Sequence, residues 1–141
     1  MIDRKTGAIT MSAAIQIRLG DSFDCIAAFR MGEMQEVSDK QTGWKWLTVK
    51  NVVVETNYFL VSFGFYNDIL LQISLVISSE RFRLNLGWEA WSEADERHTL
   101  NLLRQWVLAE LGREGGFDWG TVYTNHDPKG GTSAIHITYT A

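Results

Sequence analysis

Apolar and polar residues alternate along much of the chain, and this alternation predicts the strands of an antiparallel sheet. The two clearest stretches are residues 58–65 and residues 69–77. Because successive side chains of a strand point to opposite faces, each stretch places one row of apolar side chains on a single face. These rows are Phe59, Val61, Phe63 and Phe65 in the first stretch, and Leu71, Ile73, Leu75 and Ile77 in the second. Asn67 and Asp68 lie between them and tolerate positive φ, which predicts a tight hairpin.

Weaker alternation predicts further strands on both sides of this hairpin. The predicted strands cover residues 9–19, 44–49 with a continuation at 52–55, 81–86, 119–124 and 134–140. In the last of these, Ile135, Ile137 and Tyr139 share one face, and His136 lies on the solvent side. Residues 33–43 are polar and are interpreted as a loop, and residues 113–116 as a flexible turn.

A change to a 3.6-residue period predicts one long helix over residues 92–111. Its apolar stripe consists of Leu100, Leu103, Val107 and Leu111, widened by Leu102, Trp106 and Ala109. Ser92 and Asp95 have the spacing of a capping box, and Gly112 is placed to end the helix. Such a helix is roughly 30 Å long, enough to cross a small domain.

A shorter helix is predicted near the N-terminus, through Phe23 and Ile26 and as far as Phe29, with Asp21 or Ser22 as its cap. Cys25 lies inside it between apolar neighbours and is expected to be a small buried core residue. The predicted fold is therefore α+β: a twisted antiparallel sheet of about six strands with both helices packed on one face. At 141 residues, the chain is expected to form a single domain over residues 1–141.

Composition narrows the function classes. The single cysteine excludes an intramolecular disulfide and fits a reducing cytoplasm. No signal-peptide core and no run of about 18 apolar residues is present, so neither export nor a membrane span is expected. The net charge of −4 argues against nucleic-acid binding and permits a basic protein partner.

The residues that could carry chemistry do not form a recognisable set. The three histidines lack the spacing of a zinc site, and no cysteine is near them in sequence. The glycine-bearing loop at residues 127–132 lacks phosphate-loop spacing and precedes a strand, which favours a hairpin loop. Cys25 would need a nearby base and a lowered pKa to act as a nucleophile, and Ser92 has no nucleophile motif around it. We predict no catalytic residue, no metal site and no cofactor.

Two acidic groups are the candidate partner-binding residues. The first surrounds the start of the long helix: Trp88, Glu89, Trp91, Glu93, Asp95 and Glu96. The second lies in the polar loop: Glu33, Glu36 and Asp39. Either could attract a basic partner. The simpler interpretation of the first group is that acids suit a helix N-terminus and that tryptophans pack inward. The six tryptophans are expected mostly to fill the core or the helix–sheet boundary, and one or two could instead anchor a partner.

The C-terminal third carries a hairpin signature. It reads Phe117-Asp118-Trp119-Gly120-Thr121-Val122-Tyr123, then Asp127-Pro128-Lys129-Gly130-Gly131, then Ser133-Ala134-Ile135-His136-Ile137-Thr138-Tyr139. This ending, together with the pair Trp88 and Trp91, resembles small bacterial cytosolic immunity proteins of polymorphic or contact-delivered toxin systems. The resemblance implies a cytoplasmic protein that binds and blocks one cognate toxin. It supplies no catalytic residues.

We therefore expect a non-enzymatic protein-binding protein, an immunity protein that neutralises a cognate toxin. Two alternatives remain open. One is a small-ligand-binding or enzymatic α+β domain with a pocket between the long helix and the sheet. The other is a structural subunit of a phage or secretion assembly.

Overall fold

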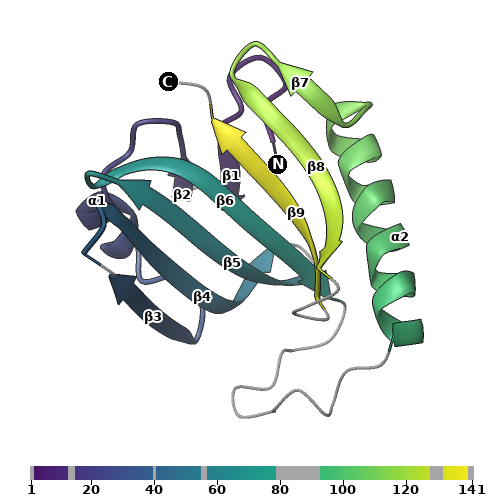
Figure 1. The fold of residues 1–141 in the computed structure, drawn as a ribbon, viewed down its shortest axis with the longest axis horizontal. Helices are drawn as coiled ribbons and strands as arrows, with labels where there is room; N and C mark the ends of the chain where they lie inside the picture. The colour runs from purple at the N-terminus through teal and green to yellow at the C-terminus, as the bar shows by residue number, and fades with distance from the viewer. Residues whose placement is uncertain are drawn as a thin grey trace.

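The computed structural model describes residues 2–12, 15–39, 41–54, 57–78, 93–127 and 132–139. These parts of the chain contain nine strands and two helices. Two strands pair as a small antiparallel sheet, β1 (Ile9–Ser12) and β2 (Ile15–Ile17). The helices are α1 (Phe23–Ala27) and α2 (Glu93–Leu111). The other seven strands form one antiparallel sheet (Figure 1) in the order β3 (Met34–Asp39), β4 (Trp44–Val54), β5 (Asn57–Tyr66), β6 (Ile69–Ser78), β9 (Thr132–Tyr139), β8 (Gly120–Asp127), β7 (Gly115–Phe117).

The predicted α+β class fits this architecture, but the predicted number of about six strands is wrong. Residues 33–43, interpreted as a loop, contain β3, which pairs with β4 from Met34 to Asp39. The turn predicted at residues 113–116 runs into β7, and two strands, β1 and β2, lie within residues 9–19, where one strand was predicted. The stretch at 44–49 and the described part of its continuation, residues 52–54, belong to one strand, β4, and the polar Lys50 and Asn51 lie in a bulge within it. The strand predicted at 81–86 lies outside the described residues.

One face of the seven-stranded sheet carries the hydrophobic core. The predicted rows on β5 and β9 are buried, and they continue into the neighbouring strands. The long helix α2 covers this face over β8 and β9, while α1 and the β1–β2 pair add further residues to the same core cluster. In Figure 1, β1 and β2 lie behind the sheet and α2 runs beside β8. The buried side chains of the sheet include Leu47, Val49, Phe59, Val61, Phe63, Phe65, Ile73, Leu75, Val122, Ile135, Ile137 and Tyr139.

The hairpin between β5 and β6 forms as predicted, with one change of register. Asn67 and Asp68 adopt φ of 51° and 65°, the left-handed conformation that a two-residue turn requires. The pairing then shifts between Gly64 and Phe65. As a result Leu70 is fully buried, whereas Leu71, which was predicted to face the core, is only half-buried.

The helix α2 ends as predicted but buries a narrower stripe. Gly112 has φ of 80°, and its N–H donates to the carbonyl of Leu108 at 2.8 Å. Leu103, Val107 and Leu111 are buried. Trp106 is half-buried and packs edge-to-face on Phe59 with ring centroids 5.9 Å apart. The predicted widening residues Leu102 and Ala109 are exposed, since they turn away from the sheet. The proposed capping pair of Ser92 with Asp95 lies outside the described side chains.

The helix α1 is shorter than predicted. Ser22 is its cap, with Oγ accepting a hydrogen bond from the Cys25 N–H at 3.2 Å, and the helix ends at Ala27. A helix of five residues presents little surface to the core, and Ile26 is its one buried residue. Cys25 precedes that position and is exposed, so the prediction of a buried core cysteine is wrong.

Candidate binding surface

The second face of the seven-stranded sheet is not covered by any of the described elements. We call this face, with its side chains on β3, β4, β5, β6, β9 and β8, the open face. Strand register places two rows of residues across it, because directly paired residues point the same way. One row is Glu36, Thr48, Ser62, Ser74, His136 and Tyr123; the other is Ser38, Trp46, Gly64, Gln72, Thr138 and Thr121.

The first row is held by hydrogen bonds between neighbouring strands. Thr48 Oγ1 and Ser62 Oγ lie 3.2 Å apart, and Ser74 Oγ lies 3.1 Å from His136 Nδ1. Apart from Glu36 at one end, this row is formed by hydroxyl, imidazole and phenol groups. His136 is exposed, as predicted from the alternation on the last strand.

Beside these rows lies an aromatic group that we call the tryptophan ledge: Trp44, Trp46 and Tyr66. The two indoles stack with centroids 6.1 Å apart and an interplanar angle of 15°. The ring centroid of Tyr66 lies 5.3 Å from that of Trp44. Trp46 lies against Gly64 so closely that a Cβ at Gly64 would be 2.6 Å from the indole Cη2. The absent side chain at Gly64 therefore lets the indole lie flat on the sheet.

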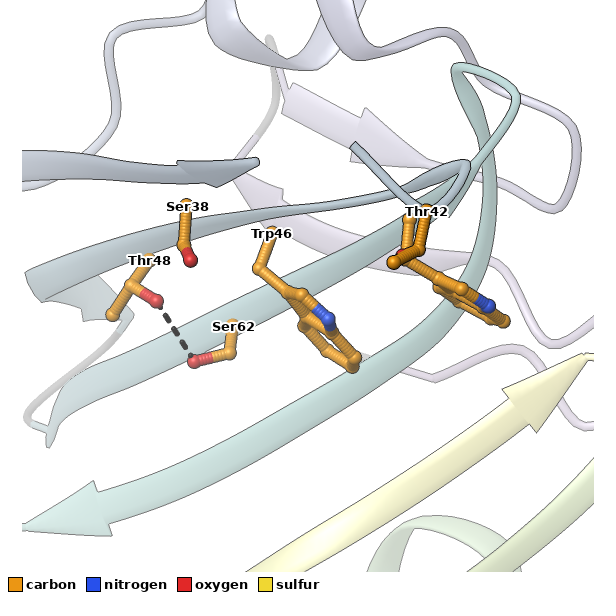
Figure 2. Close-up of a pocket in the computed structure, with 6 residues that line it drawn as sticks. Ser38, Thr42, Trp46, Thr48 and Ser62 are labelled. Carbon is orange, nitrogen blue, oxygen red and sulfur yellow. Dashed lines mark hydrogen bonds between the residues drawn. The ribbon is translucent and has the colours of Figure 1, made fainter. Parts of the chain in front are cut away.

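A hollow of about 300 Å³ lies next to the ledge. Figure 2 shows the Thr48–Ser62 hydrogen bond on one side of Trp46 and Thr42 on the other. The lining of the hollow is uncharged and comprises Ser38, Thr42, Trp44, Trp46, Thr48 and Ser62. Such a lining offers hydrogen bonds and indole surface to a group of a partner, and it contains no carboxylate, imidazole, amine or thiol.

The predicted acidic residues of the second group lie along β3 but do not share a face. Glu36 is exposed on the open face, and Asp39 lies on the opposite side of the strand. Asp39 Oδ1 accepts from the Gln41 N–H at 2.9 Å. Glu33 precedes the strand and accepts from Asn51 Nδ2 at 3.2 Å. Since Asn51 is only 2% exposed in the β4 bulge, Glu33 has a structural role there.

The first acidic group is described only in part. Trp88, Glu89 and Trp91 lie outside the described residues. Glu93, Asp95 and Glu96 belong to the first turn of α2, and their side chains are not among those described. The helix lies over β8 and β9, whereas β3 is at the opposite end of the sheet's strand order, so α2 and β3 occupy separate regions (Figure 1).

The region between the helix and the sheet is filled where the structure describes it. Leu103 and Val107 of α2 belong to the same core cluster as Val122 and Ile135 of the sheet, and all four are buried. Among the described residues no three His, Cys, Asp or Glu side chains gather as metal ligands would. Within the same residues, no helix has the length and apolar character needed to span a membrane.

Comparison with known proteins gives one informative likeness. No family model matches the sequence. The curated proteins give no match either. Among solved structures, a chain of the structure described as "Rhs1-CT in complex with cognate immunity protein RhsI1" aligns over 98% of this chain and 85% of its own length, with a TM-score of 0.55 and 14% identity. At this identity, the likeness is one of fold.

Sequence reasoning missed the tryptophan ledge as a surface feature. Two of the described tryptophans follow the general expectation, since Trp119 is buried and Trp106 lies at the helix–sheet boundary. Trp44 and Trp46 are half-buried on the open face. The sequence did contain a sign of this position. Trp44 and Trp46 occupy even-numbered positions of their strand, whereas the core-facing Leu47 and Val49 occupy odd-numbered ones.

Proposed function

We propose that this chain is a non-enzymatic immunity protein that binds and neutralises one cognate bacterial toxin in the cytoplasm. The observation that carries the proposal is the fold shared with a chain of a toxin–immunity complex over nearly the whole molecule. The sequence resemblance of the C-terminal third to immunity proteins supports the same class.

The open face supports a recognition role. Its side chains stand on paired strands, so their positions are largely set before a partner arrives, and little ordering entropy is lost on binding. Tryptophan and tyrosine are enriched at interface centres, and charged residues are depleted there. A protein that neutralises by occlusion needs a surface of this kind and no chemistry of its own.

The proposal is tested by expressing the toxin domain encoded beside this gene in bacteria, with and without this chain. Growth arrest by the toxin domain alone and restored growth with the chain are the expected results. A toxin domain from an unrelated system is the control, and the chain should give no protection against it. Failure to protect, with both proteins present and folded, would contradict the proposed function.

A further inference from the structure

We propose that the partner of this chain docks on the open face, with the tryptophan ledge at the energetic centre of the interface. This inference rests on the proposed function and names the surface that performs it.

The size of the open face fits a stable protein complex. Six strands give five inter-strand spacings of about 4.8 Å, and the ten-residue strands β5 and β6 rise about 3.3 Å per residue, so the face covers at most roughly 800 Å², since β3, β8 and β9 are shorter. A standard interface buries about 800 Å² on each partner. The 300 Å³ hollow beside Trp46 alone is shallow, but as part of the whole face it provides a recess for a partner side chain.

Charge distribution favours a basic protein over a second copy of this chain. The centre of the open face is uncharged, and Glu36 lies at its β3 end. Two copies facing each other would bring together molecules that each carry a net charge of −4. A partner with an uncharged, hydrogen-bonding centre and basic groups at its rim would complement both the centre and the β3 edge.

Gly64 positions the ledge without needing to contact the partner. It is buried beneath the Trp46 indole, and an added methyl group would meet the indole at 2.6 Å. Gly64→Ala must therefore tilt Trp46 off the sheet, while the rest of the open face keeps its composition. Truncation at position 46 and displacement from position 64 are two independent ways to disturb the same indole.

The test is a titration of purified chain with an inactivated form of the toxin domain encoded beside it. Trp46→Ala should raise the dissociation constant at least thirtyfold, the effect of losing a hot-spot side chain worth roughly 2 kcal/mol. Gly64→Ala should raise the dissociation constant by between about threefold and thirtyfold, and Trp46→Phe should retain most of the affinity. Each variant is first shown to keep the circular dichroism spectrum and unfolding midpoint of a folded chain.

Leu108→Ala is the matched control, since Leu108 is an apolar side chain 51% exposed on α2, away from the open face. Affinity within twofold of wild type is expected for it. If folded Trp46→Ala and Gly64→Ala bind as wild type does, the docking surface is wrong while the immunity role stands. If the wild-type chain forms no complex, the proposed function fails and the docking surface with it. A wild-type homodimer that Trp46→Ala dissociates would assign the face to a second copy instead.

Discussion

Trp119 joins the two ends of the chain. Its indole N–H donates to the Arg4 carbonyl at 2.9 Å, and its ring covers Gly7. Tyr139 packs against the same indole, and its hydroxyl donates to the Gly7 carbonyl at 2.7 Å. The C-terminal hairpin signature read from the sequence therefore serves to hold the N-terminal turn against the sheet.

Gly7→Ala is expected to destabilise the protein by about 2–4 kcal/mol in urea unfolding, because it combines an unfavourable backbone with a steric clash. Gly7 has φ of 73°, and an added Cβ would lie 2.4 Å from the Trp119 ring. Gly20→Ala is the control: Gly20 has φ of 88° but nothing within 4 Å of an added Cβ. Equal losses for the two variants would show that the Trp119 contact contributes nothing.

Tyr139→Phe is expected to lower the free energy of unfolding by about 1–3 kcal/mol, because the buried Gly7 carbonyl loses its hydrogen-bond donor. Urea unfolding of the two proteins at neutral pH measures this difference.

Burial, with a smaller contribution from the charge of Asp21, raises the pKa of Tyr139 above its ordinary value of 10.0. The folded chain then keeps the phenol proton at a pH where the unfolded chain releases it, so the free energy of unfolding falls as pH rises above 10. Unfolding measured between pH 9 and 11 should show a smaller fall for Tyr139→Phe. An identical slope in both proteins would contradict this assignment.

At the scale of elements, β3 shows where sequence patterning reaches its limit. Of its residues only Met34 and Val37 are apolar, and Val37 is 54% exposed because an edge strand has a neighbour on one side alone. Such a strand has no buried row to produce alternation, and it forms because β4 offers a partner ladder. The strands β5 and β9 bury complete rows, and for that reason their alternation predicted them correctly. Leu70 was missed since a register shift after Gly64 cannot be read from periodicity.

Leu103→Ala in α2 is expected to destabilise the protein by about 2–5 kcal/mol, the usual cost of a cavity at a fully buried leucine. Leu108→Ala, on the exposed side of the same helix, should change stability by no more than about 0.5 kcal/mol. Thermal unfolding of both variants makes the comparison. Similar losses would mean that α2 does not pack on the sheet in the orientation described.

At the scale of the whole molecule, the open face is a product of strand order. Trp46 and Gln72 are 26 residues apart in sequence, yet they lie in one row, with Gly64 between them, because β4, β5 and β6 pair in register. The sequence predicted the buried rows of β5 and β9, and it placed His136 on the solvent side correctly. It could not predict the contact between Ser74 and His136. That contact requires β6 to pair with β9, and α2, β7 and β8 lie between these two strands in the sequence.

The net charge of −4 predicts how association depends on salt. For a basic partner, raising the salt concentration from about 0.05 M to 0.5 M should slow association by roughly tenfold or more, with a much smaller change in dissociation, because screening weakens long-range attraction. Stopped-flow mixing followed by tryptophan fluorescence can measure both rates. An association rate that is independent of salt would contradict a basic partner.

Oxidative footprinting of the tryptophans, in the free chain and in its complex with the inactivated toxin domain, tests recognition through the open face most directly. Trp44 and Trp46 should be modified in the free chain and strongly protected in the complex, while the buried Trp119 should be slow to react in both. Unchanged modification of Trp44 and Trp46 in a fully formed complex would contradict the account.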